Sequence, residues 1–132
     1  MYLFFDTETT GLPRNWKAPI TDFNNWPRLV QLAYLLFDGE GKKINAGKYI
    51  IKPEGFSIPV EASNIHRITN EKAISEGLPL ISVLDDFKKS ILRSEYLVAH
   101  NISFDESHNS EVDINATAKC FWELKKLGVI KY

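Results

Sequence analysis

Two carboxylates, Asp6 and Glu8, directly follow a short apolar segment at the start of the chain, Tyr2 to Phe5. Four consecutive apolar residues are typical of a strand buried on both faces of a sheet. If this strand continues through Glu8, both carboxylates point to one face, because the side chains of a strand alternate. Two like charges this close raise each other's pKa unless a cation lies between them, and hard oxygen ligands favour Mg²⁺ or Mn²⁺. The alternative is that the pair opens a solvated turn over Thr9 to Gly11.

A second acidic position follows another short apolar segment, where His100 and Asn101 lead to Asp105. Open α/β sheets usually bind their ligands at strand ends. A carboxylate in the first turn of a helix is equally explained by its favourable interaction with the helix dipole, so Asp105 alone does not predict a site.

His108 and Asp113 form a third group, with four residues between them. The apolar residues from Ala116 to Leu124 form a helical stripe that places Asp113 on the apolar side of the last expected helix. A carboxylate there needs a partner, which a metal ion would provide. The alternative is that Asp113 caps this helix and that His108 is a solvated loop residue.

Apolar runs and turn residues predict the elements that position these groups. The expected strands are Tyr2 to Phe5, Arg28 to Phe37, Ile44 to Lys52 and Tyr96 to Ala99, and the expected helices are Pro59 to His66, one starting at Asn70 with Thr69 as its cap, residues 79–93, and Ser103 to the C-terminus. Residues 11–27 are expected to form a long loop. A meander followed by helix, strand and helix predicts an α/β domain with a mixed sheet.

Two of these elements carry more detailed expectations. Gly39 and Gly41 are expected to supply the positive φ angles of a hairpin turn. In the helix over residues 79–93, one apolar stripe is expected to face the core, whereas Asp85, Lys88 and Lys89 face outward. The residues of this stripe are Leu80, Val83, Leu84, Phe87 and Ile91.

The composition describes an ordinary single domain over residues 1–132. The chain has 44% hydrophobic residues and a formal net charge of −1, which suits one core and argues against a protein that coats long nucleic acids by bulk charge. No apolar run is long enough to span a bilayer, and no secretory signal follows Met1. A lone cysteine, Cys120, fits a reducing compartment. We therefore expect a cytoplasmic protein without a membrane partner.

Taken together, the three acidic groups resemble the motifs of one family. The segment Asp6 to Pro13, the pattern His100-Asn101-x-x-Phe104-Asp105 and the pair His108-x4-Asp113 resemble, in this order, the three motifs of DEDDh-type 3′–5′ exonucleases, which include the proofreading epsilon subunits of bacterial DNA polymerase III. Residues 62–69 and 113–118 are similar to two further segments of the family.

The resemblance implies a ribonuclease H-like fold and release of 5′-mononucleotides from a 3′ end with two divalent metal ions, Mg²⁺ or Mn²⁺. Its partners would be a single-stranded 3′ end of DNA or RNA and a DNA polymerase. The resemblance assigns metal binding to Asp6, Glu8, Asp105 and Asp113, the role of general base to His108, and substrate contacts to Thr9, Leu12 and His66. A histidine, with a pKa of about 6.5, can accept a proton near neutral pH.

Several of these substrate contacts have simpler explanations. Leu12 is equally expected to pack on the core, and the more common interpretation of His66 is a surface histidine. Trp16 and Trp26 could stack on bases, but aromatic residues beside prolines usually anchor a loop.

The chain departs from the family between the second and third motifs. Only Glu106 and Ser107 separate Asp105 from His108, where the family has several tens of residues that include a fifth strand. On one continuous helix Asp105 and Asp113 would lie roughly 12 Å apart along the axis, too far to share a metal pair. Three explanations stay open: an internal deletion near residues 106–107, residues missing from the sequence, or a minimal domain with a rearranged last helix. Without its fifth strand, the strand Tyr96 to Ala99 would be an exposed edge that invites self-association.

The sequence therefore predicts a metal-dependent 3′–5′ exonuclease, acting on DNA in proofreading or repair, whose activity depends on how the short connection folds. The alternative is a non-catalytic nucleic-acid-binding or protein-interaction module with an exonuclease-like fold. A third hypothesis is an unstable remnant. The motifs do not distinguish DNA from RNA, or proofreading from oligonucleotide turnover.

Overall fold

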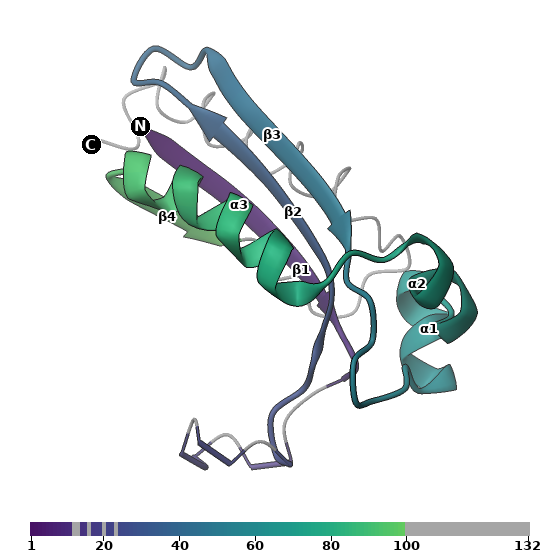
Figure 1. Cartoon of the computed structure of the whole chain (residues 1–132). Coiled ribbons are helices and arrows are strands. Elements are labelled where there is room, and N and C mark those ends of the chain that lie inside the picture. The colour runs from purple at the N-terminus through teal and green to yellow at the C-terminus, as the bar shows by residue number, and fades with distance from the viewer. Residues whose placement is uncertain (12–13, 16, 20, 23, 100–132) are drawn as a thin grey trace.

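A computed structural model of the chain describes residues 1–11, 14–15, 17–19, 21–22 and 24–99 (Figure 1). The elements in these residues are β1 (Tyr2–Thr9), β2 (Leu29–Phe37), β3 (Lys43–Ile50), α1 (Val60–His66), α2 (Asn70–Glu76), α3 (Leu80–Arg93) and β4 (Tyr96–Ala99). Each expected element up to residue 99 is confirmed. The largest difference is at β1, which continues four residues beyond the apolar run. The expected C-terminal helix lies outside the described residues.

The four strands form one mixed sheet in the order β3-β2-β1-β4. β1 pairs antiparallel with β2, β2 pairs antiparallel with β3, and β4 pairs parallel with β1. Figure 1 shows α3 along one face of this sheet, while α1 and α2 lie beyond its end. The predicted α/β domain with a mixed sheet is therefore confirmed, and the described part of the sheet has four strands.

β1 is the central strand and is buried on both faces. Leu3 packs with Tyr34 on the face that α3 covers, and the ring of Phe5 contacts that of Phe87 on α3 with 5.6 Å between the centroids. On the opposite face Phe4 packs with Leu35. A strand with apolar side chains on both faces is stable only in the middle of a sheet, which explains why the chain places its first strand there.

The β2–β3 turn is held by Asp38. Its carboxylate accepts hydrogen bonds from the backbone amides of Glu40 (2.9 Å) and Lys42 (3.0 Å), and these donors lower the pKa of the Asp38 carboxyl. The expectation that both glycines adopt positive φ is wrong for Gly39, because only Gly41 does so (φ 85°). The aspartate side chain stabilises the turn that a second left-handed glycine would otherwise provide.

The short helices α1 and α2 cover the end of the sheet near the start of β2. The predicted cap is confirmed, since the side chain of Thr69 accepts a hydrogen bond from the backbone amide of Lys72 (3.1 Å). α1 ends where Arg67 adopts the left-handed conformation (φ 64°). The apolar cluster beneath both helices consists of Val30, Ile58, Ala62, Ile68 and Ala73.

α3 contacts the sheet through a face that differs from the expected stripe. Val83 and Ser90 are buried, and Phe87 packs on Tyr34, but Leu84 is 43% exposed and Ile91 is also exposed. The expected apolar stripe is therefore confirmed at Val83 and Phe87 and wrong at Leu84 and Ile91. The apolar pattern did not reveal the polar contact on the neighbouring flank of the helix, where Asp86 bonds to β2 and β3.

Asp86 accepts hydrogen bonds from two tyrosine hydroxyls, that of Tyr34 on β2 (2.8 Å) and that of Tyr49 on β3 (2.5 Å). These two donors lower the pKa of the Asp86 carboxyl. Burial raises the pKa of Tyr34, and its hydrogen bond to Asp86 raises it further. At Tyr49 the hydrogen bond to Asp86 is the larger cause of the raised pKa, and burial is the second. One carboxylate thus fixes α3 to two strands.

No helix in the described part of the chain is long and apolar enough to cross a bilayer.

The Asp86 anchor predicts a pH-dependent stability. Because the folded-state pKa of Asp86 is lowered, its contribution is present above the unfolded-state pKa and is lost as pH falls through the folded-state value. We expect Asp86→Asn to lower the free energy of unfolding by about 1–2 kcal/mol at pH 7, and by less at pH 3. Urea unfolding at both pH values measures this. Asp85→Asn, an exposed change of the same charge on the same helix, is the control, and equal losses in the two variants would contradict the anchor.

Candidate functional site

The acidic pair lies on β1, which continues through Glu8 as far as Thr9. Asp6 is 4% exposed and Glu8 is 9% exposed. The neighbouring Phe5 packs against α3, so alternation places both carboxylates on the face of the sheet that points away from α3. The predicted common face of Asp6 and Glu8 is therefore confirmed, and the alternative of a solvated turn is wrong for these two residues.

After Glu8 the backbone leaves the sheet in a turn that the side chain of Thr9 closes. The pairing of β1 with β2 shifts register between Glu8 and Thr9. The hydroxyl of Thr9 donates to the carbonyl oxygen of Gly11 (2.8 Å) and accepts from its amide (3.3 Å). Gly11 has φ 148°, which a residue with a side chain rarely adopts. Thr9, which the resemblance assigned to substrate binding, thus also shapes the turn.

The same turn is tied to the start of β2. The amide of Thr10 donates to the carbonyl oxygen of Arg28 (3.0 Å), and the amide of Arg28 donates to the hydroxyl of Thr10 (2.9 Å). This pair of bonds holds the loop after the acidic pair against the sheet, and it fixes the position of Arg28 relative to Glu8.

Asp6 and Glu8 place two buried carboxylates on one face of the sheet. Each loses hydration on burial, so each needs polar or charged partners. Asp6 has one such partner locally, because its Oδ1 accepts from the amide of Thr7 (2.8 Å). The carboxylate oxygens of Asp6 and Glu8 are ligands of the kind that hard divalent cations such as Mg²⁺ and Mn²⁺ prefer. Their burial and common face therefore suit part of a metal centre.

The structure brings together only this part of the predicted site. Leu12, Asp105, His108 and Asp113 lie outside the described residues. Among the residues that are described, no group of three or more His, Cys, Asp or Glu side chains could hold a metal ion. The assignment of the other two carboxylates and of the general base stays a prediction.

His66 differs from its expected position. The interpretation as a surface histidine is wrong, because the side chain is 5% exposed at the end of α1. Its Nδ1 accepts a hydrogen bond from the backbone amide of Ile68 (3.2 Å). The left-handed Arg67 folds the chain back so that this amide reaches the imidazole. His66 therefore holds the turn between α1 and α2.

The loop between β1 and β2 is anchored by polar contacts. The indole of Trp26 donates to the carbonyl oxygen of Pro19 (2.8 Å), which confirms its expected anchoring role. The side chain of Asn25 bridges the backbone amide and carbonyl of Asn15 at 2.8 and 2.9 Å. Trp16 lies outside the described residues.

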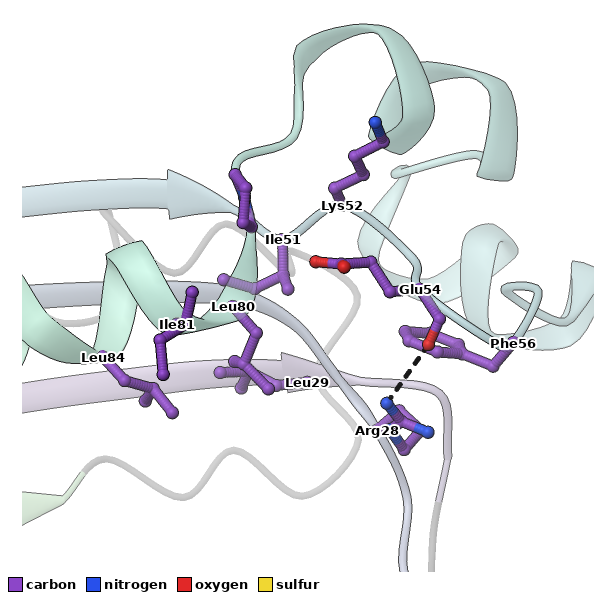
Figure 2. Close-up of a pocket in the computed structure, with 10 residues that line it drawn as sticks. Arg28, Leu29, Ile51, Lys52, Glu54, Phe56, Leu80, Ile81 and Leu84 are labelled. Carbon is purple, nitrogen blue, oxygen red and sulfur yellow. Dashed lines mark hydrogen bonds between the residues drawn. The ribbon is translucent and has the colours of Figure 1, made fainter.

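A pocket of about 340 Å³ opens beside the start of β2, and sequence analysis missed it (Figure 2). Its lining residues are Arg28, Leu29, Ile51, Lys52, Glu54, Phe56, Pro79, Leu80, Ile81 and Leu84. They come from three separate segments of the chain. The nearest signal in the sequence was an arginine that follows a proline (Arg28) and an aromatic residue that follows a glycine (Phe56).

The chain matches a known family over most of its length. Residues 3–124 match the family described as Exonuclease. A search of curated proteins found no match.

Solved structures with this fold include several nucleases. Exonuclease I from Methylocaldum szegediense is 22% identical with a TM-score of 0.60, and the aligned region covers 76% of this chain and 20% of that one. E. coli exonuclease I in complex with a dA16 oligonucleotide is 20% identical with a TM-score of 0.59 and the same coverage of both chains. Exonuclease X in complex with 5′ overhanging duplex DNA is 27% identical with a TM-score of 0.53, and 76% of this chain aligns with 49% of that one.

These structures confirm the fold. The predicted ribonuclease H-like architecture is the one that the exonuclease structures share with this chain. The present chain spans about a fifth of the length of the exonuclease I chains.

The acidic pair predicts a specific response to metal ions. A cation bound by the folded chain stabilises it by an amount that grows with the logarithm of its concentration, about 2.7 kcal/mol at 100 times the dissociation constant. We expect Mn²⁺ to raise the melting temperature of the chain. Asp6→Asn, which removes one charged ligand, should abolish most of the Mn²⁺ response.

Thermal unfolding with and without Mn²⁺ measures both effects. Asp85→Asn, on the opposite side of the sheet, is the matched control. An equal Mn²⁺ response in the Asp6 and Asp85 variants would contradict a metal site at Asp6.

Proposed function

Because the chain belongs to the exonuclease family, we propose that it is a metal-dependent 3′–5′ exonuclease that releases 5′-mononucleotides from nucleic-acid 3′ ends. The observation that carries this proposal is the burial of Asp6 and Glu8 on one face at the end of the central strand. A single-stranded DNA 3′ end is the proposed substrate, and proofreading or repair beside a DNA polymerase in the cytoplasm is the proposed setting. The oligonucleotide and duplex DNA in the complexes of E. coli exonuclease I and exonuclease X support a nucleic-acid substrate.

Four carboxylates would hold the metal ions: Asp6, Glu8, Asp105 and Asp113. Two divalent cations, when bound, supply the positive charge that an in-line displacement at phosphorus needs on its attacking and leaving oxygens. The backbone at Asp6 and Glu8 is held by the ladder with β2, where these residues lie opposite Ala33 and Gln31, so little reorganisation is needed.

The remaining roles fall to residues near the terminal nucleotide. His108 is proposed to accept the proton of the attacking water. Thr9 and Leu12 are proposed to position the nucleotide, with the Thr9–Gly11 turn as a rigid support. Since the imidazole of His66 is buried, its contribution would come through the turn that it holds at Ile68.

An exonuclease assay tests the proposal. The chain is incubated with Mn²⁺ and single-stranded DNA labelled at the 5′ end, and then with the same DNA labelled at the 3′ end. We expect the 3′ label to be released at once as a mononucleotide and the 5′-labelled strand to shorten stepwise. Asp6→Asn and Glu8→Gln should each lower the rate at least about 100-fold, because each removes a charged ligand.

The matched control is Glu40→Gln, an exposed carboxylate of the β2–β3 turn. If this variant loses as much activity as Glu8→Gln, the acidic pair is not the site. If the chain binds DNA but releases no mononucleotide with either metal, the alternative of a non-catalytic nucleic-acid-binding module replaces the enzyme. A matching RNA strand in the same assay identifies the preferred sugar.

A second copy of the chain is a further proposed partner. β4 is the outermost strand on its side of the described sheet, and Leu97 in its middle is 56% exposed. An exposed apolar edge invites pairing with another strand. We expect sedimentation equilibrium to show a mass that rises with concentration, and Leu97→Lys to shift the chain toward monomer.

Ile44→Lys, an exposed apolar residue on β3 at the other edge, is the control. Self-association through β4 is contradicted if the chain is monomeric at every concentration, or if both variants act alike.

A further inference from the structure

The pocket at the start of β2 has walls of two kinds (Figure 2). Leu29, Ile51 and Leu80 line its apolar side, and Arg28 brings positive charge to its rim, whereas the ammonium of Lys52 points away from Arg28. Its volume, about 340 Å³, is at the lower end of the range of roughly 300–1,000 Å³ in which proteins bind small ligands. Such a space suits one compact ligand with an apolar body and a negative charge.

Arg28 is held in a fixed orientation. Its guanidinium lies 4.5 Å from the centroid of the Phe56 ring, and its Nη2 donates to the carbonyl oxygen of Glu54 (3.4 Å). Two hydrogen bonds tie its backbone to Thr10. A guanidinium that is already ordered loses less entropy when it binds an anion, and its planar fork matches the oxygens of a phosphate.

The apolar side of the pocket extends to its mouth. Ile81 is 70% exposed and Leu84 is 43% exposed, both on the first turns of α3. Contact between exposed aliphatic side chains and a flat apolar surface is favourable in free energy, because it removes the side chains and that surface from water. A nucleobase has such a surface on each face.

The pocket is linked to the acidic pair through the sheet. Leu29 lies opposite Thr9 in the β1–β2 ladder, and Thr9 directly follows Glu8. The pocket lies beside α3, whereas Asp6 and Glu8 lie on the opposite face. A nucleic-acid strand that engages both must therefore reach both faces of the sheet.

We propose that this pocket is a second nucleotide-binding site, in which Arg28 holds a phosphate and the side chains of Ile81 and Leu84 cover the base. The nucleotide has two conceivable sources, an internal nucleotide of the substrate strand or a free mononucleotide. The first source rests on the proposed function, and the second does not. Glu54 on the same rim opposes a phosphate, so the proposal predicts that removal of its charge tightens binding.

The test measures binding by the whole chain in EDTA, so that neither hydrolysis nor metal binding contributes. The probes are dAMP, a thymidine dinucleotide and a thymidine octanucleotide, each titrated by isothermal calorimetry. Arg28→Gln keeps the backbone bonds and the aliphatic stem, and we expect it to weaken binding about 5–20-fold and to reduce the salt dependence by about one phosphate contact. Glu54→Gln should strengthen binding a few-fold.

The matched control is Arg93→Gln, the same exchange at the opposite end of α3, which should leave binding unchanged. Circular dichroism melting confirms that each variant is folded. Weaker binding of the octanucleotide alone by Arg28→Gln assigns the pocket to the substrate strand, and weaker binding of dAMP assigns it to free mononucleotides.

The proposal is overturned if Arg28→Gln and Arg93→Gln bind every probe alike, or if no probe binds to the chain. It is also overturned if only an acidic peptide with an apolar residue competes for the pocket. A chain that binds through Arg28 but hydrolyses nothing would refute the exonuclease and retain the pocket. A chain that hydrolyses DNA, but whose binding of every probe is unchanged by Arg28→Gln, would retain the exonuclease and refute the pocket.

Discussion

A strand buried on both faces carries two carboxylates at its end, and the rest of the described structure follows from this arrangement. β1 buries Leu3 and Phe4 on opposite faces of the sheet, and residues 2–5 are paired with a strand on each side. The pairing with β2 continues through Asp6 and Glu8 and fixes the backbone there, where rigidity is useful for binding a cation. The hydrophobic core and the candidate site are therefore products of the same hydrogen-bonded ladder.

The opposite face shows how one polar contact can set the placement of a helix. Asp86 joins α3 to β2 and β3 through two tyrosine hydroxyls. On the same helix Ile81 and Leu84 stay in contact with water. The pocket beside Arg28 uses both residues, so part of its apolar wall is formed by side chains that the helix does not bury against the sheet.

Local patterns in the sequence predicted the elements well and their environments less well. The alternation of side chains placed Asp6 and Glu8 on one face, but the apolar run alone underestimated the length of β1, since its last residues are held by pairing with β2 rather than by their own hydrophobicity. His66 was misjudged because its burial depends on a left-handed turn at Arg67 that brings the amide of Ile68 to the imidazole. The pocket was missed because its walls come from segments that are distant in the chain. Motif order, in contrast, identified the family correctly, because it depends on the chemistry of the residues and not on their packing.

The parallel pairing of β1 with β4 has a consequence for the order of folding. Tyr2 is paired with Tyr96, and the backbone amides of Glu95 and Tyr96 both donate to the carbonyl oxygen of Met1 (2.9 and 3.3 Å). The meander of β1, β2 and β3 needs only contacts between neighbouring segments, whereas this closure joins residues far apart in the sequence and must wait until β4 has been synthesised. Contacts of such long sequence separation form slowly. During synthesis the second edge of β1 is therefore open, and the nascent chain is most exposed to aggregation in the interval before β4 emerges.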